Sequence, residues 1–366
     1  MQQPVCLSSL AGLTQGHFRE FRETACSPAG HNSGLWRTCL FFMTPYDDQT
    51  KLCIACLAAI DGVGPVTIRK LLSAASGEAS ELLRFLGLPS YALQKEFGFS
   101  ASVARTITDI DDPTAKGQAV CRRVIAAGGR PVFDGEPEYP SRLSAVLRDE
   151  APVVLFVRGQ PGILQAPTVA IVGSRRPSPV ARRAAKKISA CLSDAGYTVV
   201  SGGARGIDST AHEGALRNGA TAVLPATGIL RFRLRKRRTS LPSEGSCCVL
   251  GHFAPDARWR TRQALGRNRL IVALGQAVVA FEPRDTGGTW HSSTQALKLG
   301  VPLFVVCGSD AQTKQQGLRR LVCSGATALD PERMPDADAF AALVAEKGRE
   351  TRPAQSEMFE RDGEPG

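Results

Sequence analysis

The sequence contains no long apolar run and no export signal. Within its 366 residues, no uninterrupted apolar stretch approaches the roughly 20 residues that span a bilayer. The first 45 residues lack the charged start, apolar middle and small-residue cleavage site of a secretory signal. These absences argue against a membrane-spanning or secreted protein. They predict a cytoplasmic protein with no membrane partner.

Signatures of common cofactor and metal enzymes are also missing. The strand-like run that ends at Gly173 continues as SRRPSP, without the GxGxxG pattern of nicotinamide-binding folds. No acidic residue ends the next strand-like run to hold a ribose. His212, His252 and His291 lie in different predicted elements, without the ligand spacing of a metal site. We therefore expect no cofactor and no metal ion.

Eleven cysteines are present, but their positions do not predict disulfide bonds. Cys191, Cys307 and Cys323 lie within apolar runs, where a thiol packs as a small hydrophobic side chain. Cys53 and Cys56 form a CxxC pattern on an apolar helical repeat, without a second pair or a flanking histidine. We interpret them as reduced thiols, as expected in the cytoplasm.

Positive charge dominates the composition. There are 45 lysines and arginines against 34 acidic residues, which gives a formal net charge of +11 and a pI near 9.3. Such a balance favours an acidic partner, of which nucleic acid is the most common and an anionic membrane surface the next. A solvated basic surface without a polyanionic ligand remains the alternative.

The first 130 residues are predicted to contain a leader and a small helical domain. Residues 1–48 show neither helical nor strand periodicity, which indicates a disordered leader or an upstream start-site artefact. Residues 49–130 follow a helical apolar pattern that is interrupted by Ile60-Asp61-Gly62-Val63-Gly64-Pro65, as in a helix-hairpin-helix turn. Its two glycines either expose backbone amides to a DNA phosphate at the next helix or serve only as a tight structural turn.

Residues 131–330 alternate short strand-like and helical patterns. A short helix and the strand 153–158 lead into β-branched runs at 168–174, 197–203, 221–228, 276–282 and 301–308. Helical patterns follow at 179–195, 208–218, 268–274, 294–299 and 317–323. This alternation is typical of an α/β fold with a Rossmann-like parallel sheet and helices on both faces. Residues 331–366 hold one short helical pattern, at 336–346, and a polar tail that we expect to be disordered.

Small residues follow each strand-like run at the point where the chain turns. These turns are Gly173-Ser174-Arg175, Ser201-Gly202-Gly203-Ala204-Arg205-Gly206, Thr227-Gly228, Thr286-Gly287-Gly288-Thr289 and Gly308-Ser309. We expect them to converge, because the carboxyl ends of parallel strands lie along one edge of a sheet. Glycine lets backbone amides approach an anion closely, and Arg175 and Arg205 within the turns favour an anionic ligand.

Two other segments concentrate positive charge. Gly266-Arg267-Asn268-Arg269-Leu270-Ile271 places two arginines around an asparagine just before a predicted helix, where guanidinium groups can clamp phosphate or stack on a base. The run 231–238 holds six basic residues in eight and either follows a polyanion or forms a solvated linker. Asp208, at the start of another predicted helix, is interpreted as an N-cap rather than a catalytic group.

Several of these motifs resemble one known family. VAIVGSR, VVSGGARGIDSTAHEGAL, RNRLIVALGQAVVAFEP and TGGTWHSSTQALKLGVPLFVV occur in an order similar to that of the DprA/Smf family of DNA-processing proteins, over roughly residues 52–330. The resemblance implies a Rossmann-like domain preceded by a helix-hairpin-helix or SAM-like domain. It also implies a non-catalytic, homodimeric protein that binds single-stranded DNA, protects incoming strands during natural transformation of competent cells, and loads the RecA recombinase onto them.

By matching positions, the resemblance implies a pocket that binds DNA phosphates, built from the turns after the strands and from the RNR segment. Its residues are Gly173, Ser174, Arg175, Ser201, Gly202, Gly203, Ala204, Arg205, Gly206, Arg267, Asn268 and Arg269, with Gly287, Gly288 and Thr289 beside them. The physical argument from glycine turns and arginines selects the same positions.

The chain departs from the family pattern in several places. Residues 229–250 carry the basic run and Cys247-Cys248, Gly251-His252 replaces a more common Ser-Glu pair, and GGTW replaces a plainer loop. The C-terminal winged helix of many family members is expected to be absent from this divergent member.

Two other functions are compatible with this type of fold. A nucleoside-monophosphate phosphoribohydrolase needs a glutamate just after its glycine loop, whereas residues 286–295 contain no carboxylate. A sensor of small nucleotides is harder to separate from a DNA-binding protein, because a pocket for a free nucleotide presents nearly the same chemistry as a pocket for one nucleotide of a strand. We therefore expect a protein without enzymatic activity, and the alternative is a nucleotide-binding sensor or a phosphoribohydrolase-like enzyme of the same fold superfamily.

Overall fold

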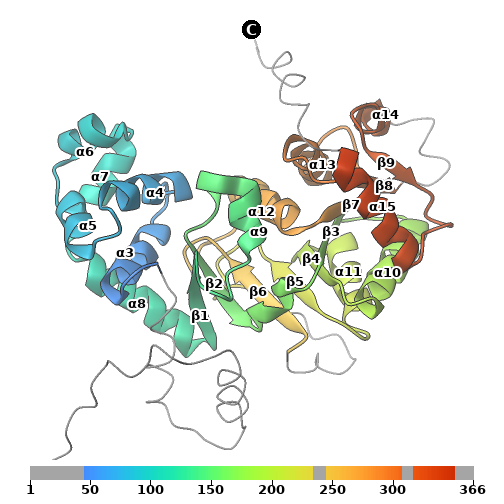
Figure 1. Cartoon of the computed structure of the whole chain (residues 1–366), viewed down its shortest axis with the longest axis horizontal. Helices are drawn as coiled ribbons and strands as arrows, with labels where there is room; N and C mark the ends of the chain where they lie inside the picture. Colours follow the sequence, from blue (N-terminus) through green and yellow to red (C-terminus); the bar gives the residue numbers. More distant parts are fainter. Residues whose placement is uncertain (1–44, 234–244, 307–315, 351–366) are drawn as a thin grey trace, which may run out of the picture. The chain divides into compact units, whose positions relative to one another are not determined.

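The computed structural model of the chain describes residues 45–233, 245–306 and 316–350 (Figure 1). Several expectations fall outside these ranges: the leader up to residue 44, the basic run from residue 234 onward, Cys307, the Gly308-Ser309 turn and the tail after residue 350. No helix in the described ranges is long and apolar enough to cross a bilayer. The domain boundaries drawn from the sequence stay predictions.

Six helices precede the sheet in residues 45–126: α3 (Asp48–Ala58), α4 (Pro65–Ala74), α5 (Ala79–Leu86), α6 (Ser90–Phe97), α7 (Ala101–Thr108) and α8 (Pro113–Ala126). Their apolar faces share one core, which includes the buried Cys53 and Cys56. Both thiols are free, and burial raises the pKa of Cys56 to about 11. The CxxC pair therefore packs as hydrophobic side chains, as its position on an apolar repeat predicts.

The turn between α3 and α4 has the geometry that the glycine pattern predicts. Gly62 adopts φ 91°, a left-handed conformation that glycine reaches without a steric penalty. Pro65 then occupies the first turn of α4, where its missing amide hydrogen costs nothing. The helix–turn–helix arrangement is thus confirmed, and a DNA contact at this turn stays a prediction.

Nine strands form one sheet: β1 (Gly129–Phe133), β2 (Val154–Gly159), β3 (Thr168–Gly173), β4 (Thr198–Gly202), β5 (Thr221–Leu224), β6 (Cys247–Gly251), β7 (Ala277–Phe281), β8 (Leu303–Val306) and β9 (Thr327–Leu329). Their order is β1-β2-β6-β5-β4-β3-β7-β8-β9. The seven strands from β6 to β9 in this order are parallel, whereas β2 pairs antiparallel with both β1 and β6. The α/β, Rossmann-like prediction is confirmed for a sheet that is mostly parallel.

Three strands escaped the sequence analysis. β1 and β9 lie at the edges of the sheet, and β6 lies in the segment that looked irregular. β6 contains Cys247 and Cys248, which are weaker strand signals than the β-branched runs of β3 and β7. Pairing with β5 and β2 forms this strand, so its tertiary neighbours outweigh its weak local preference.

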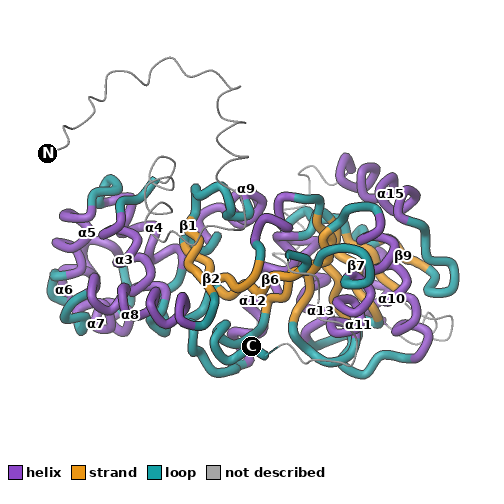
Figure 2. The backbone as a smooth tube through the Cα atoms, turned by 90° about the horizontal axis from the view of Figure 1, so that it is seen from below, coloured by secondary structure: helices purple, strands orange, loops and turns teal. Residues whose placement is uncertain are grey.

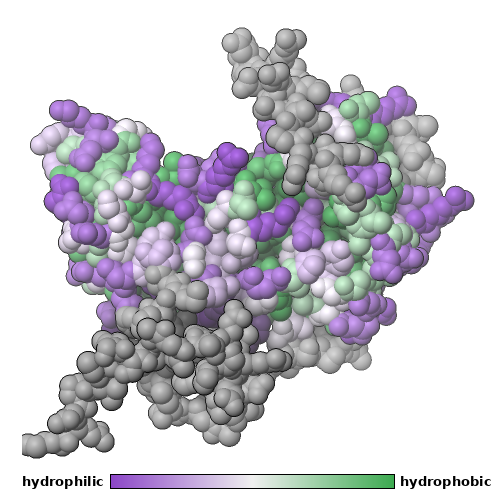
Figure 3. All heavy atoms as spheres, in the orientation of Figure 1, coloured by the Kyte–Doolittle hydropathy of each residue, from purple (hydrophilic) through white to green (hydrophobic). Residues whose placement is uncertain are grey.

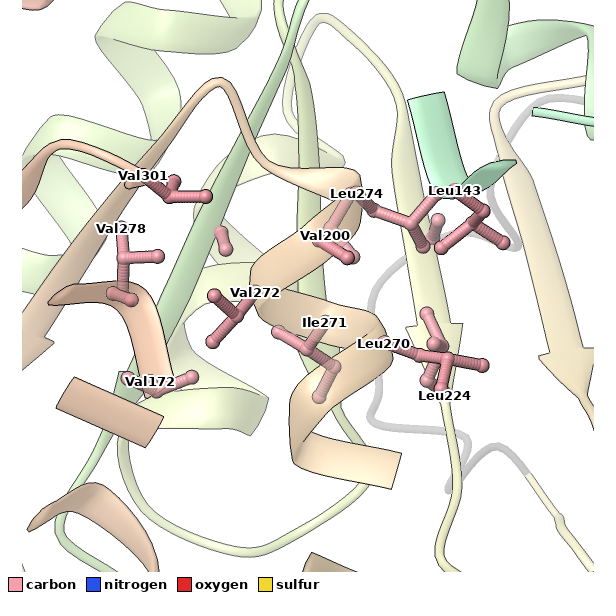
Figure 4. Close-up of a cluster of buried hydrophobic side chains, with 14 of the residues drawn as sticks. Leu143, Val172, Val200, Leu224, Leu270, Ile271, Val272, Leu274, Val278 and Val301 are labelled. Carbon is pink, nitrogen blue, oxygen red and sulfur yellow. The ribbon is translucent and has the colours of Figure 1, made fainter. Parts of the chain in front are cut away.

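Helices cover both faces of the sheet, and the strands run between them (Figure 2). The helices from residue 141 onward are α9 (Ser141–Leu147), α10 (Pro179–Asp194), α11 (Ile207–Ala215), α12 (Thr261–Leu274), α13 (Gly288–Lys298), α14 (Gln316–Cys323) and α15 (Ala337–Glu350), with short 3-10 turns at Arg148–Glu150 and Pro161–Gln165. One core joins α9, α12, α13 and α14 to one face, and another joins α10, α11 and α15 to the opposite face. Figure 4 shows part of the first core, around α12. On the face of the molecule that Figure 3 shows, hydrophilic side chains alternate with apolar patches.

The order of the strands reverses its direction at β3. From β3 the chain proceeds through β4, β5 and β6 on one side, and it then returns through α12 to place β7 on the other side of β3. α10, which follows β3, and α13, which follows β7, pack on opposite faces of the sheet. In open α/β sheets, ligands bind outside the carboxyl ends of the strands at such a switch point. The carboxyl ends of β3, β4 and β7 are therefore the place to look for a site.

Candidate functional site

The turns after β3 and β4 are packed directly against each other. The Ile207 amide donates a hydrogen bond to the Ser174 carbonyl at 3.1 Å, and a Cβ added to Gly173 would lie 2.6 Å from the Ile207 side chain. Gly206 has φ 93°, and a Cβ there would lie 2.3 Å from the Ser174 oxygen. Glycine is thus needed at both positions because the two backbones approach so closely.

Arg267 lies at the centre of the site. It projects from the middle of α12, it is only 7% exposed, and its Nη1 donates to the Leu224 carbonyl at the end of β5, at 2.7 Å. A Cβ added to Gly202 would lie 1.8 Å from this Nη1 and 2.5 Å from the Asp208 Oδ2. Gly202 therefore leaves the space in which the guanidinium and the carboxylate meet.

Burial and charge oppose each other in this group. Burial raises the pKa of the Asp208 carboxyl, and the Arg267 guanidinium opposes that rise. Burial likewise lowers the pKa of Arg267, against the attraction of Asp208. His252 lies near enough to feel the same cation, and burial with this repulsion lowers its pKa to about 3. His252 is therefore neutral near pH 7.

The turn after β7 joins the same edge. The Ser174 amide donates to the Phe281 carbonyl at 3.3 Å, and the Asn268 side-chain amide donates to the Gly288 carbonyl at 3.4 Å. Gly287, at φ 96°, is the N-cap of α13. Residues 173–175, 202–206, 267–268 and 286–289 thus form one continuous surface at the carboxyl ends of β3, β4 and β7, which we call the rim.

Exposed positive charge surrounds the buried pair. Arg175 and Arg205 are exposed, and Arg175 interacts electrostatically with both Asp208 and Arg267. Within the part of the chain that the structure describes, neither Arg175 nor Arg205 has an ion-pair partner, and the amides of Gly203 and Arg205 donate to no protein acceptor. Free amides and guanidinium groups on a glycine-rich edge are the donors that bind phosphate.

Some predicted site residues have other roles. The buried Ser201 hydroxyl donates to the Ile171 carbonyl at 2.5 Å, inside the sheet and away from solvent. The Arg269 side chain lies on a different side of α12 from Arg267 and forms an ion pair with Glu150. Gly228 accommodates the carbonyls of Ala254 and Pro255, which lie 2.3 and 2.2 Å from the position of an added Cβ. Close backbone packing explains that glycine without a ligand.

Two local predictions about these residues are wrong. The RNR segment lies inside α12 rather than before it, because the helix begins at Thr261, seven residues earlier than expected. Asp208 is not an N-cap: Gly206 holds that position, and Asp208 is the second residue of α11. Its carboxylate instead accepts a hydrogen bond from the Ala204 amide at 3.3 Å and faces Arg267. A buried partner far away in the sequence determines its role.

Other residues of the site gave no signal in the sequence. The buried His212 imidazole lies 2.7 Å from both the Thr221 hydroxyl and the Gly202 carbonyl, and burial lowers its pKa to about 4. The Phe232 ring lies against Gly203, 2.5 Å from the position of an added Cβ. Among the described residues, no cluster of three metal-binding side chains is found. Through its contacts with Thr221 and Gly202, the His212 imidazole supports the turn after β4.

Comparisons with known proteins agree with this fold and site. The family model described as DNA recombination-mediator protein A matches residues 130–336. The chain belongs to this family. The match begins at β1 and continues past β9, so it contains all four segments of the rim.

Curated relatives extend the comparison. This chain is 31% identical over 190 residues to the DNA processing protein DprA of Streptococcus pneumoniae, covering 51% of this chain and 66% of that protein. It is 29% identical over 224 residues to the protein Smf of Synechocystis, covering 59% of this chain and 56% of the relative. The chain thus spans between about half and two thirds of the length of these relatives.

A solved structure supports the fold. The X-ray structure of DNA processing protein A from Streptococcus pneumoniae matches with a TM-score of 0.52 and 23% identity, over 76% of this chain and 98% of that one. The α/β architecture is therefore that of the DNA recombination-mediator protein A family.

Proposed function

We propose that this chain is a DNA-processing protein that binds single-stranded DNA along the rim. The observation that carries the proposal is the layered arrangement of donors: Arg267 is buried, donates to the Leu224 carbonyl and interacts electrostatically with Asp208, while Arg175 and Arg205 are exposed without ion-pair partners among the described residues. Phosphate oxygens accept hydrogen bonds from such guanidinium groups and from free backbone amides. The net charge of +11 supports a polyanionic ligand over a neutral one.

We propose that the bound strand is held without being chemically changed. Asp208, the carboxylate that interacts electrostatically with Arg175, is buried and accepts a hydrogen bond from the Ala204 amide. It is therefore not available as a general acid or base for a nucleotide. We propose a protein without catalysis, which needs no cofactor.

The wider role rests on the DprA/Smf family resemblance. We propose that the protein works in the cytoplasm as a homodimer, protects incoming single strands during natural transformation, and loads RecA onto them. Sedimentation of the full chain tests the homodimer, and a RecA filament-assembly assay on coated strands tests the loading.

An oligonucleotide titration tests the ligand itself. The full chain is mixed with labelled oligonucleotides of increasing length and with mononucleotides, at several salt concentrations. We expect affinity to rise with length and to fall steeply with salt. Arg175→Ala should weaken binding and lower the slope of log K against log salt by about 0.7, because one phosphate contact of a single strand is lost. Arg205→Ala should act in the same direction.

Arg105 provides a matched control. It is an exposed arginine on α7, outside the rim, so Arg105→Ala removes the same charge without touching the proposed contact. Equal losses of affinity in Arg105→Ala and Arg175→Ala would indicate that the strand is bound only by non-specific attraction to the net positive charge. Tight binding of a mononucleotide that does not improve with oligonucleotide length would instead support the nucleotide sensor.

A further inference from the structure

An exposed tryptophan lies just before the helix that carries Arg267. The Trp259 side chain is 52% exposed, two residues before α12 begins at Thr261. The other described tryptophan, Trp290, is half-buried, and the Arg320 guanidinium lies 5.4 Å from its ring centroid. The exposed indole ring of Trp259 is thus available to a ligand, with an apolar face and a hydrogen-bond donor.

The segment that carries Trp259 is held in place from several sides. The Gly228 amide donates to the Ala257 carbonyl at 3.0 Å, and the Leu230 amide donates to the Pro255 carbonyl at 2.8 Å. Asp256 forms an ion pair with Arg123 of α8 at 2.7 Å. The ring is thus presented by a fixed backbone, which lowers the conformational entropy that a ligand contact would cost.

Two further arginines flank the ring and face solvent. Arg258 and Arg262 are exposed, and within the described ranges neither has an ion-pair partner. The acidic groups of the neighbourhood are already engaged, because Asp256 pairs with Arg123 and Asp61 pairs with Arg260. An exposed aromatic ring with unpaired arginines one residue before it and three residues after it in the sequence matches a strand of nucleic acid, in which planar bases alternate with phosphates.

α12 connects this segment to the rim. Its residues 261 and 267 lie about 9 Å apart along the helix axis, at about 1.5 Å per residue. A strand held at the rim by its phosphates can therefore reach Trp259 within a few nucleotides.

We propose that Trp259 is a base-stacking platform for the strand that leaves the rim, with Arg258 and Arg262 holding the phosphates on either side of the stacked base. The inference rests on the proposed binding of single-stranded DNA and adds a second subsite to it. Stacking needs an unpaired base, so this subsite favours a single strand over a duplex.

The experiment compares variants of the full chain on a labelled 20-nucleotide single strand and on a duplex of the same length, by fluorescence anisotropy at fixed salt. Trp259→Ala should weaken binding to the single strand by about tenfold or more, whereas Trp259→Phe should keep most of the affinity. Affinity for the duplex should change by less than about twofold in both variants, because its bases are already stacked. Tyr91→Ala removes another exposed aromatic ring, on α6 away from the rim, and should leave both affinities unchanged.

Intrinsic fluorescence supplies a second readout. Titration with the unlabelled single strand should quench tryptophan emission in the wild-type chain, and most of this quenching should disappear in Trp259→Phe even though that variant still binds. A merely structural contribution of Trp259 would not separate quenching from affinity in this way.

The failures of the two proposals can be told apart. Wild-type affinity in Trp259→Ala, together with weakened binding in Arg175→Ala, would overturn the stacking platform and leave the rim in place. Equal losses for single strand and duplex would also overturn it, as would a change in oligomeric state on sedimentation, which would assign the ring to a protein contact. If the wild-type chain binds no strand at all, the proposed function itself fails.

Discussion

The turn at residues 60–65 and the rim begin from the same sequence signal, glycines that lead into a helix, but their surroundings differ. At the turn, a Cβ added to Gly64 would meet nothing within 4 Å, and Asp61 forms an ion pair with Arg260. At the rim, a Cβ added to Gly206 would lie 2.3 Å from the Ser174 oxygen, and exposed arginines stand beside the turn.

The difference teaches that glycine turns alone do not define an anion site. In both places a helix begins and its dipole favours negative charge. Only the rim adds a buried guanidinium at its base and unpaired guanidinium groups above it, among the described residues. The turn instead carries a carboxylate, Asp61, whose ion pair already engages the nearby cation Arg260. Four predictions sharpen or break this comparison.

Removing the buried cation should have the largest effect. Arg267→Met should lower the free energy of unfolding by about 3–5 kcal/mol, because it leaves the Asp208 carboxylate buried without its partner. Urea unfolding of the purified chain measures the loss. Adding Asp208→Asn to the same chain should recover part of it. If the losses of stability in Arg267→Met and in Asp208→Asn simply add up in the double variant, the two side chains are not energetically coupled.

Filling the space beside the Arg267 guanidinium should have the second largest effect on stability. Gly202→Ala should cost about 2–3 kcal/mol, because the new methyl group overlaps the guanidinium. The same substitution in the Arg267→Met background should cost clearly less, since the group that it overlaps is gone. Urea unfolding again provides the measurement. An equal cost in both backgrounds would mean that Gly202 is constrained by something other than Arg267.

Acidification should destabilise the rim through His212. Burial lowers its native pKa to about 4 from the value of 6.5 in an unfolded chain. Below pH 6.5 the His212 imidazole therefore binds a proton in the unfolded state but not in the native state. The free energy of unfolding is thus highest above this pH and falls as the pH drops toward 4. Between pH 7 and pH 5 the loss is about 2 kcal/mol for this group.

The control for this pH effect is His212→Gln, which cannot titrate. In this variant the difference in the free energy of unfolding between pH 7 and pH 5, measured by urea unfolding, should be smaller by about 2 kcal/mol. His252, whose pKa is lowered to about 3, should leave a residual trend of the same sign in the variant. An unchanged pH profile in His212→Gln would contradict the assignment.

The smallest effect is expected at the other glycine turn. Gly64 is the N-cap of α4 with φ −103°, a conformation open to any residue, and no side-chain hydrogen bond caps this helix. Gly64→Ser should therefore stabilise the chain by a few tenths of a kcal/mol through a new cap. A large loss of stability, in thermal unfolding, would show that the turn is as tightly constrained as the rim.

Much of the fold could be predicted because its signals are local. The runs that became β3, β4 and β7 are continuous and β-branched, as strands buried on both faces must be. β6 could not be predicted in this way, since its neighbours β5 and β2 are separated from it in the sequence and supply its hydrogen bonds. The antiparallel pairing of β2 was missed for the same reason.

The candidate site divides along the same line. The convergence of Gly173, Gly206 and Gly287 on one edge followed from the parallel strands. The direction of each side chain did not: Arg267 points to Asp208, whereas Arg269, two residues later on α12, points to Glu150. Helical geometry turns residues two apart to different sides, so an error in where α12 begins also misplaces what its arginines contact.

The sequence by itself determined the alternation of strands and helices, the glycine turns after the parallel strands, and the excess of positive charge, because periodicity, chain reversal and composition depend on neighbouring residues. The tertiary structure alone decided that Gly202, Asp208 and Arg267 share one buried space and that Trp259, just before the helix that carries Arg267, is exposed. Such contacts join residues far apart in the chain, and which of them form depends on how α12 packs across the sheet.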